Sequence, residues 1–158
     1  MIEKEELESL IPHRGRMLLL SRVKDYNLEE RRLCAEYQIS EDCLFYDPEL
    51  GGVPAWAGFE FIAQSISVFA GIRNRAKGLK PNMGFILSIP SMKVELPLFK
   101  AGSCVELRVR ECDYMDMIYS FEGEAFLEGR KAMEGKLMVM EIDKEKYNGL
   151  VTEHSFVK

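Results

Sequence analysis

The sequence of 158 residues predicts one α+β domain, spanning 1–158, in which a curved antiparallel sheet of about six strands wraps around one long central helix. Residues 55–77 predict a helix, and from Trp56 to Ile72 it is apolar or small on nearly all sides, which is typical of a buried helix. The flanking segments alternate apolar and polar residues, as strands with one solvated face do. Because a sheet hides an apolar helix only by curling around it, both patterns predict the same architecture.

Signals at both ends support the central helix. Pro54 supplies a fixed φ close to the first turn. Near the other end, Arg73, Arg75 and Lys77 place positive charge where the helix macrodipole is negative. Gly78 follows, and glycine readily adopts the left-handed conformation that ends a helix.

The chain before the central helix predicts a short helix and two strands. Residues 3–10 suit a short helix that Pro12 ends. The apolar run 17–23 predicts a strand with both faces covered, and 31–40 predicts a half-buried antiparallel strand because every second residue is apolar. Residues 41–53 have no periodic pattern, so they predict an irregular connection.

The chain after the central helix predicts only strands. The phase of the apolar positions changes at Pro90, which indicates a bulge or bend in a strand that is accessible from a sheet edge. Residues 105–110 alternate and predict another strand. Strands at 117–127 and 130–142 flank the Glu-Gly pair 128–129, which is a hairpin signal.

Composition and charge exclude several classes of function. A formal net charge of −5 gives no general attraction to phosphate backbones, so no nucleic-acid partner is expected. The acidic N-terminus lacks a secretory pattern, and the uncharged run 61–72 is shorter than the roughly 20 residues of a membrane span. We therefore expect a soluble, cytoplasmic protein without membrane insertion.

The cysteines are not expected to bind metal or to form disulfides. They lie far apart, without a CxxC pair or a nearby histidine cluster. We expect ordinary reduced thiols. The four are Cys34, Cys43, Cys104 and Cys112.

Glu60 is the first candidate for chemistry, because it interrupts the apolar surface of the central helix. Gln64 and Ser67 follow at helical spacing and share its face. A carboxylate in such surroundings loses hydration and is retained only with partners or a chemical use. The alternative is a structural acid paired with an arginine.

His13 is the second candidate, at the junction of the first helix and the first strand. Histidine exchanges protons in either direction near neutral pH. The alternative is a loop histidine that satisfies backbone groups after Pro12. His154 is close to the C-terminus, and we expect it to have no role.

Three motifs occur in order along the chain. Residues 10–14 read LIPHR and precede MLLLSRV at 17–23; EFIAQ follows at 60–64, and GF at 84–85 opens the later strands. This order and spacing resemble the hotdog-fold β-hydroxyacyl-(acyl carrier protein) dehydratases of fatty-acid synthesis. The combination PHRG.M…GVPAW.G.E…AQ more closely resembles a divergent branch, the dehydratase-like proteins of aryl-polyene lipid biosynthesis.

The resemblance implies a hotdog fold and a 3-hydroxyacyl thioester substrate on acyl carrier protein or coenzyme A. It implies no cofactor. It also implies a homodimer, or a heterodimer with a related hotdog subunit, because in this fold the substrate tunnel lies between two subunits. One feature departs from the family. The catalytic histidine of the family lies in a G-H-F-P-G segment before the helix. Counting back from Glu60 places Tyr46 at that histidine and Pro48 at the proline of the segment, so this chain has no histidine there.

Dehydration of such a thioester must polarise the carbonyl, remove an α-proton and protonate the leaving hydroxyl. The helix N-terminus at Ala55 and Trp56 offers backbone N–H groups for the carbonyl oxygen. His13 and Glu60 are the expected catalytic pair, and Gln64 is positioned to hold the carboxyl or the hydroxyl.

Three further residues complete the expected binding site. Asp47 is an auxiliary or orienting carboxylate, and Tyr46 is a substitute proton donor, although a tyrosine is a weak base at neutral pH. Trp56 either walls an acyl tunnel or packs in the core.

Two other functions fit the same sequence. Thioester hydrolysis on this scaffold would use Glu60 or Asp47 to activate water. A noncatalytic partner subunit or acyl-binding module would explain the absence of the usual histidine. The fold alone does not choose among these functions, because dehydratases and thioesterases share it.

Overall fold

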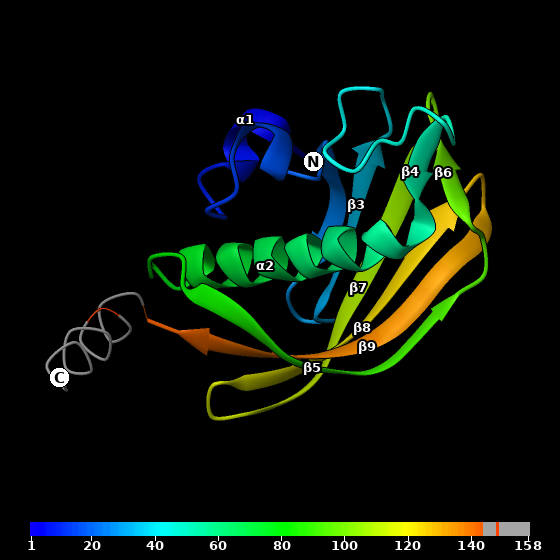
Figure 1. Cartoon of the computed structure of the whole chain (residues 1–158). Coiled ribbons are helices and arrows are strands. Elements are labelled where there is room, and N and C mark those ends of the chain that lie inside the picture. Colours follow the sequence, from blue (N-terminus) through cyan, green and yellow to red (C-terminus); the bar gives the residue numbers. More distant parts are fainter. Residues whose placement is uncertain (144–147, 149–158) are drawn as a thin grey trace, which may run out of the picture.

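The computed structural model describes residues 1–143 and 148, so the prediction for His154 lies outside the described residues. A seven-stranded antiparallel sheet curves around helix α2, Gly58–Ala76, which lies along its inner face (Figure 1). The helix packs against four strands, β3, β7, β8 and β9. The hotdog architecture predicted from the sequence is therefore confirmed.

The strands follow the order β1-β2-β3-β7-β8-β9-β5 across the sheet. Their bounds, in that order, are Ile2–Glu3, Arg22–Asn27, Arg32–Gln38, Cys104–Met115, Ile118–Leu127, Arg130–Ile142 and Met83–Val94. A separate two-stranded sheet pairs β4 with β6, Gly52–Pro54 with Leu98–Lys100. The short helices are α1, Lys4–Leu7, and two 3-10 turns, Gly15–Met17 and Ala55–Ala57.

The alternation and turn signals predicted the strands that follow the central helix. Glu128 and Gly129 both have positive φ, 51° and 77°, as the tight turn between β8 and β9 requires. Strand β5 lies at a sheet edge, and its register with β9 shifts between Ile86 and Ser91. The shift brackets Pro90, which confirms the predicted bulge and edge position.

The predicted strand at 17–23 is wrong. Leu18, Leu19 and Leu20 are fully buried, but strand structure begins only at Arg22. The backbone of this segment bonds instead to the side chain of Gln64 on α2. Buried backbone groups need hydrogen-bond partners, and here a side chain supplies what a neighbouring strand would have supplied.

Helix α2 is not covered on every side, which corrects a second expectation. The sheet covers one side, and the N-terminal segment reaches Gly71, where an added Cβ would lie 2.5 Å from the carbonyl oxygen of Leu10. A strip along the helix stays partly exposed, and it includes Glu60, Ala63 and Ser67. This open strip is the place where a ligand can meet the helix.

The apolar character of α2 follows from its place in the core. Ala55–Ala76 is long and apolar enough to cross a membrane, but most of it is buried inside the fold. The core helix of a soluble protein has the same properties.

Candidate active site

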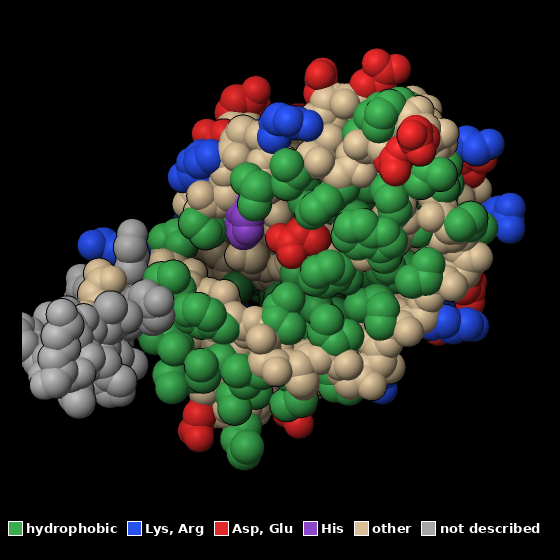
Figure 2. Space-filling view, viewed as in Figure 1, with side chains coloured by type: hydrophobic (Ala, Val, Ile, Leu, Met, Phe, Trp, Pro, Cys, Tyr) green, Lys and Arg blue, Asp and Glu red, His purple; other side chains and the backbone are tan. Residues whose placement is uncertain are grey.

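His13 and Glu60 lie together at the open face of α2. The Nε2 atom of His13 is 3.9 Å from the Oε1 atom of Glu60, and both side chains are 27% exposed. Glu60 stands in the first turn of α2, and His13 comes from the irregular segment after α1. Figure 2 shows a histidine beside an acidic side chain at the edge of a hollow surrounded by hydrophobic side chains. The structure thus brings together the two residues predicted as catalytic.

Gln64 connects Glu60 to the N-terminal segment. Its Nε2 donates to Glu60 Oε1 at 3.1 Å and to the carbonyl oxygen of Met17 at 2.9 Å, while its Oε1 accepts the N–H of Leu19 at 2.8 Å. The Leu19 N–H must face the amide oxygen, so the orientation of the amide is fixed. Both N–H groups of the amide are then used, and Gln64 is 1% exposed. Gln64 therefore contacts the Glu60 carboxyl, which is one of the two partners expected for it.

A pocket of about 340 Å³ opens between α2, the edge strand β5 and its neighbour β9. His13 and Glu60 line it near the start of the helix. The walls are mainly apolar or small, which suits an acyl chain. The other lining residues are Leu10, Ala63, Ile66, Ser67, Ala70, Gly71, Asn82, Gly84, Phe85, Ile86, Val139 and Glu141.

The environment of His13 favours the neutral imidazole. Burial lowers the pKa of His13 below its ordinary value of 6.5; the Glu60 carboxylate opposes this, and Arg14 adds to it. The Nδ1 atom is buried and has no hydrogen-bond partner among the described residues. An uncharged ring with Nε2 towards the pocket is a form that can accept a proton.

The other predicted binding residues do not line this pocket. Asp47 accepts the N–H groups of Glu49 and Leu50 through Oδ1, so it stabilises its own turn. Tyr46 packs against the core. Trp56 is 57% exposed and makes an edge contact with Phe45, so it is neither a core residue nor part of this pocket wall.

Ala55 corrects the expectation of unpaired amides at the helix entry. Its N–H donates to the carbonyl oxygen of Pro97 at 3.0 Å, and the residue is 1% exposed. This amide is therefore not free to hold a thioester oxygen. The expectation can hold only for the amides that follow Ala55.

Sequence reasoning missed Asn82 and Glu141 in the pocket wall. Glu141 lies on β9 with its side chain on the inner face, two residues after the buried Val139. The sequence does contain a signal for Glu141, because a charged residue stands there at a strand position whose side chain points towards the core. Asn82, in the connection to β5, carries no such signal.

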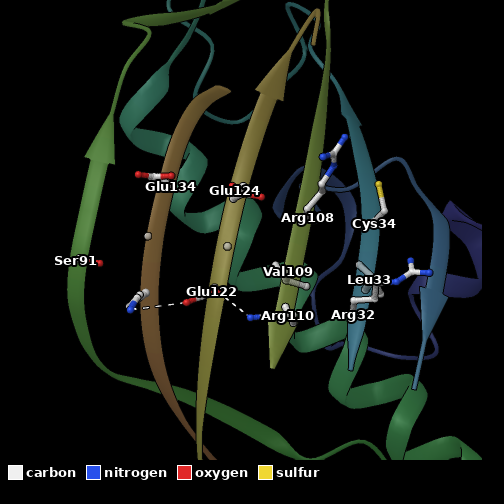
Figure 3. Close-up of a pocket in the computed structure, with 13 residues that line it drawn as sticks. Arg32, Leu33, Cys34, Ser91, Arg108, Val109, Arg110, Glu122, Glu124 and Glu134 are labelled. Atoms are coloured by element: carbon white, nitrogen blue, oxygen red, sulfur yellow. Dashed lines mark ion pairs between the residues drawn. The ribbon is translucent and has the colours of Figure 1, made fainter. Parts of the chain in front are cut away.

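A larger cavity of about 630 Å³ lies on the outer face of the sheet and shares no residue with the pocket at His13. Figure 3 views it with α2 behind the strands. The side chains over it are mutually neutralised: Glu122 pairs with Arg110 at 3.6 Å and with Lys136 at 3.8 Å. The smaller pocket on the helix side, which His13 and Glu60 line, is therefore the candidate site.

A sheet curved around one central helix defines a hotdog-fold protein, and in this one an imidazole and a carboxylate line a pocket along that helix. Solved structures agree. The dehydratase heterocomplex ApeI:P from Xenorhabdus doucetiae superposes with a TM-score of 0.81 at 23% identity, over 92% of this chain and 96% of that chain. A hypothetical thioesterase with coenzyme A from Streptococcus pneumoniae gives a TM-score of 0.59 at 10% identity, over 77% of this chain and 85% of that chain.

Sequence comparison identifies the family. Residues 5–150 match the ApeP-like family, described as ApeP dehydratase, and the chain belongs to it. The 3-hydroxyacyl-(acyl-carrier-protein) dehydratase FabZ of Mannheimia succiniciproducens is 31% identical over 144 residues, 87% of this chain and 91% of the relative. FabZ of Haemophilus influenzae is 28% identical over 142 residues, which cover 87% of this chain and 93% of that relative. The resemblance read from the motifs is confirmed.

Proposed function

We propose that this chain dehydrates 3-hydroxyacyl thioesters, presented by acyl carrier protein or coenzyme A, in the pocket along α2. The observation that carries the proposal is the His13 and Glu60 pair, 3.9 Å apart at one end of a mainly apolar pocket. The gap is longer than a hydrogen bond, which leaves both groups able to face a substrate. Membership in a dehydratase family supports the reaction type.

In this proposal the two side chains divide the proton transfers. Neutral His13 accepts the α-proton at Nε2, and the C–H electron pair forms the new double bond as the C–O bond breaks. The step requires Glu60 as the neutral carboxylic acid, which donates its proton to the departing hydroxyl so that the hydroxyl leaves as water. The proton on His13 then returns to Glu60 and restores both groups. Gln64 holds the carboxyl in place by donating an N–H from Nε2 to Glu60 Oε1.

The thioester oxygen needs a separate site. Because the N–H of Ala55 is already bonded to Pro97, we place this oxygen at the amide of Trp56, at the positive end of the helix. No side chain is required for this role. Tyr46 and Asp47 have no part in these steps.

We also propose that the chain works as a dimer with a related hotdog subunit or a second copy. Edge strand β5 exposes large apolar side chains, among them Leu87 at 47%, Val94 at 45% and Ile89 at 40%. An unpaired apolar edge strand pairs readily with another chain. The ApeI:P structure is a heterocomplex, which supports pairing with a different subunit. A cytoplasmic location remains part of this proposal.

The test is an assay with purified protein, alone and mixed with a related hotdog subunit. A 3-hydroxyacyl thioester and the matching trans-2-enoyl thioester are incubated separately, and enoyl absorbance and free thiol are followed. Interconversion without thiol release supports the proposal. Thiol release would make the protein a thioesterase instead. Binding without either change, with and without the second subunit, would make it a noncatalytic acyl-binding subunit.

A further inference from the structure

A buried ion-pair network closes one end of the space between α2 and the sheet. Arg73 on α2 contacts Glu111 of β7 through Nη1 and Glu141 of β9 through Nη2. The side chains of the three residues are 14%, 5% and 8% exposed. The guanidinium also lies 4.4 Å from the ring centre of Tyr119. The cation is therefore held from three sides and has little freedom to move.

This network stands between two cavities. Glu141 lines the 340 Å³ pocket that holds His13 and Glu60. Arg73 and Glu111 line a second cavity of about 320 Å³, which has no lining residue in common with the first. The contact between Arg73 and Glu141 is thus a partition between the two spaces.

The partition lies far along the helix from the proposed reaction site. Glu60 and Gly71 both line the first pocket and stand eleven positions apart, about 16 Å along an α-helix. Gly84, which pairs with Glu141 across the β5 and β9 ladder, also lines it. A chain whose thioester end sits beside Glu60 would run along the helix towards Glu141.

An apolar chain end has an unfavourable contact at this wall. Pressing a methyl group against Glu141 would remove the remaining water from a carboxylate and offer no hydrogen bond in return. Moving the carboxylate aside would separate it from Arg73 and leave two buried charges without each other. A chain that reaches the wall therefore gains nothing from further length.

We propose that Glu141, held by Arg73, is the end stop that sets the longest acyl chain the pocket accepts. The inference rests on the proposed function, because it assumes that the thioester lies beside His13 and Glu60. Glu141 is thus a specificity-determining residue and takes no part in the proton transfers.

The test compares Glu141→Ala with Glu141→Gln on saturated 3-hydroxyacyl thioesters of increasing chain length. Alanine removes the partition and joins the two cavities, whereas glutamine keeps the length of the side chain and can still bond to Arg73. In Glu141→Ala, Arg73 still pairs with Glu111, which favours folding. Should this variant fail to fold, Glu141→Thr shortens the side chain with a residue that suits a strand.

The expected result is a shift of the kcat/KM profile towards longer chains in Glu141→Ala, by about tenfold in the ratio of long to short substrates. Glu141→Gln should keep the wild-type limit. A folded Glu141→Ala with an unchanged profile, or with equal loss at every length, would overturn the proposal.

Binding separates this proposal from the proposed function. Calorimetry with unreactive acyl-pantetheine amides of the same lengths reports the end stop without turnover. If the wild type dehydrates none of the thioesters, the proposed reaction fails, while the amide series still decides where the pocket ends. An amide length limit that Glu141→Ala leaves unchanged would refute the end stop even in an active enzyme.

Discussion

Gln64 Nε2 lies 3.1 Å from Glu60 Oε1, one helical turn away, and the same amide holds the backbone of Met17 and Leu19. One buried side chain therefore fixes the carboxyl and also the segment that follows His13. The spacing of the two proposed catalytic groups depends on this link, since His13 and Glu60 make no closer contact than 3.9 Å.

Replacement of Gln64 by methionine should lower both stability and activity. Methionine fills a similar volume but leaves the buried N–H of Leu19 and the partly buried carbonyl of Met17 without this partner, so we expect a loss of about 2 kcal/mol in the free energy of unfolding. The matched control is Ser65→Ala on the same helix, which removes only a bond to the carbonyl of Phe61. Urea unfolding measures both; equal losses would contradict the role given to Gln64.

Glu60→Gln and His13→Asn should each reduce kcat about 10²–10⁴-fold, because each removes one of the two proton transfers. Both side chains are partly exposed, so the far-UV circular dichroism and the melting curve should stay close to wild type. Glu122→Gln, on the outer face of the sheet, is the control and should keep full activity. An active, folded Glu60→Gln would rule out the proposed acid.

The lowered pKa of His13 predicts the pH dependence of activity and stability. Because the pKa of His13 in the folded state lies below 6.5, part of the imidazole stays neutral below that pH. The acid limb of the kcat/KM profile should therefore have its midpoint below pH 6.5. As the pH drops below 6.5, the unfolded chain binds a proton that the folded state resists, so His13 reduces stability there.

His13→Asn should therefore show a shallower loss of unfolding free energy than wild type as the pH falls below 6.5. Chemical denaturation across that range gives the comparison. Identical slopes in the two proteins would show that folding does not lower the pKa of His13.

Arg73→Met should destabilise the protein by about 3–5 kcal/mol, because it leaves the buried carboxylates of Glu111 and Glu141 without their shared cation. Arg75→Met, two positions along the same helix, breaks an exposed pair with Glu6 and should cost about 0–1 kcal/mol. Denaturant midpoints measure the difference. Similar costs at the two positions would mean that the buried network contributes little.

Leu87→Lys should weaken association if β5 is the dimer edge, since it places a charge in an exposed apolar strand. Met115→Lys, at the end of β7, is the matched control, because Met115 is 72% exposed and away from β5. Light scattering after size-exclusion chromatography gives the mass of each variant. A dimer that survives Leu87→Lys unchanged would place the interface elsewhere.

Periodic patterns predicted the elements whose conformation depends on neighbouring residues. The alternation at 105–110, the Glu-Gly turn at 128–129 and the phase change at Pro90 all describe backbone preferences or faces that are set within a few residues. The motifs also indicated Glu60 and His13 as a pair. Neither pattern nor motif contains the distance between them.

Local patterns in the sequence predicted the central helix and most strands of the sheet, and the apolar surface of the helix forces the sheet to enclose it. The remaining features depend on contacts between distant parts of the chain. Leu18–Leu20 is a buried coil because a glutamine 45 positions away bonds to its backbone. Glu141 reaches the pocket because Arg73 neutralises it across 68 positions. These hydrogen bonds form only when distant parts of the chain come together in the fold, so local sequence preferences do not predict them.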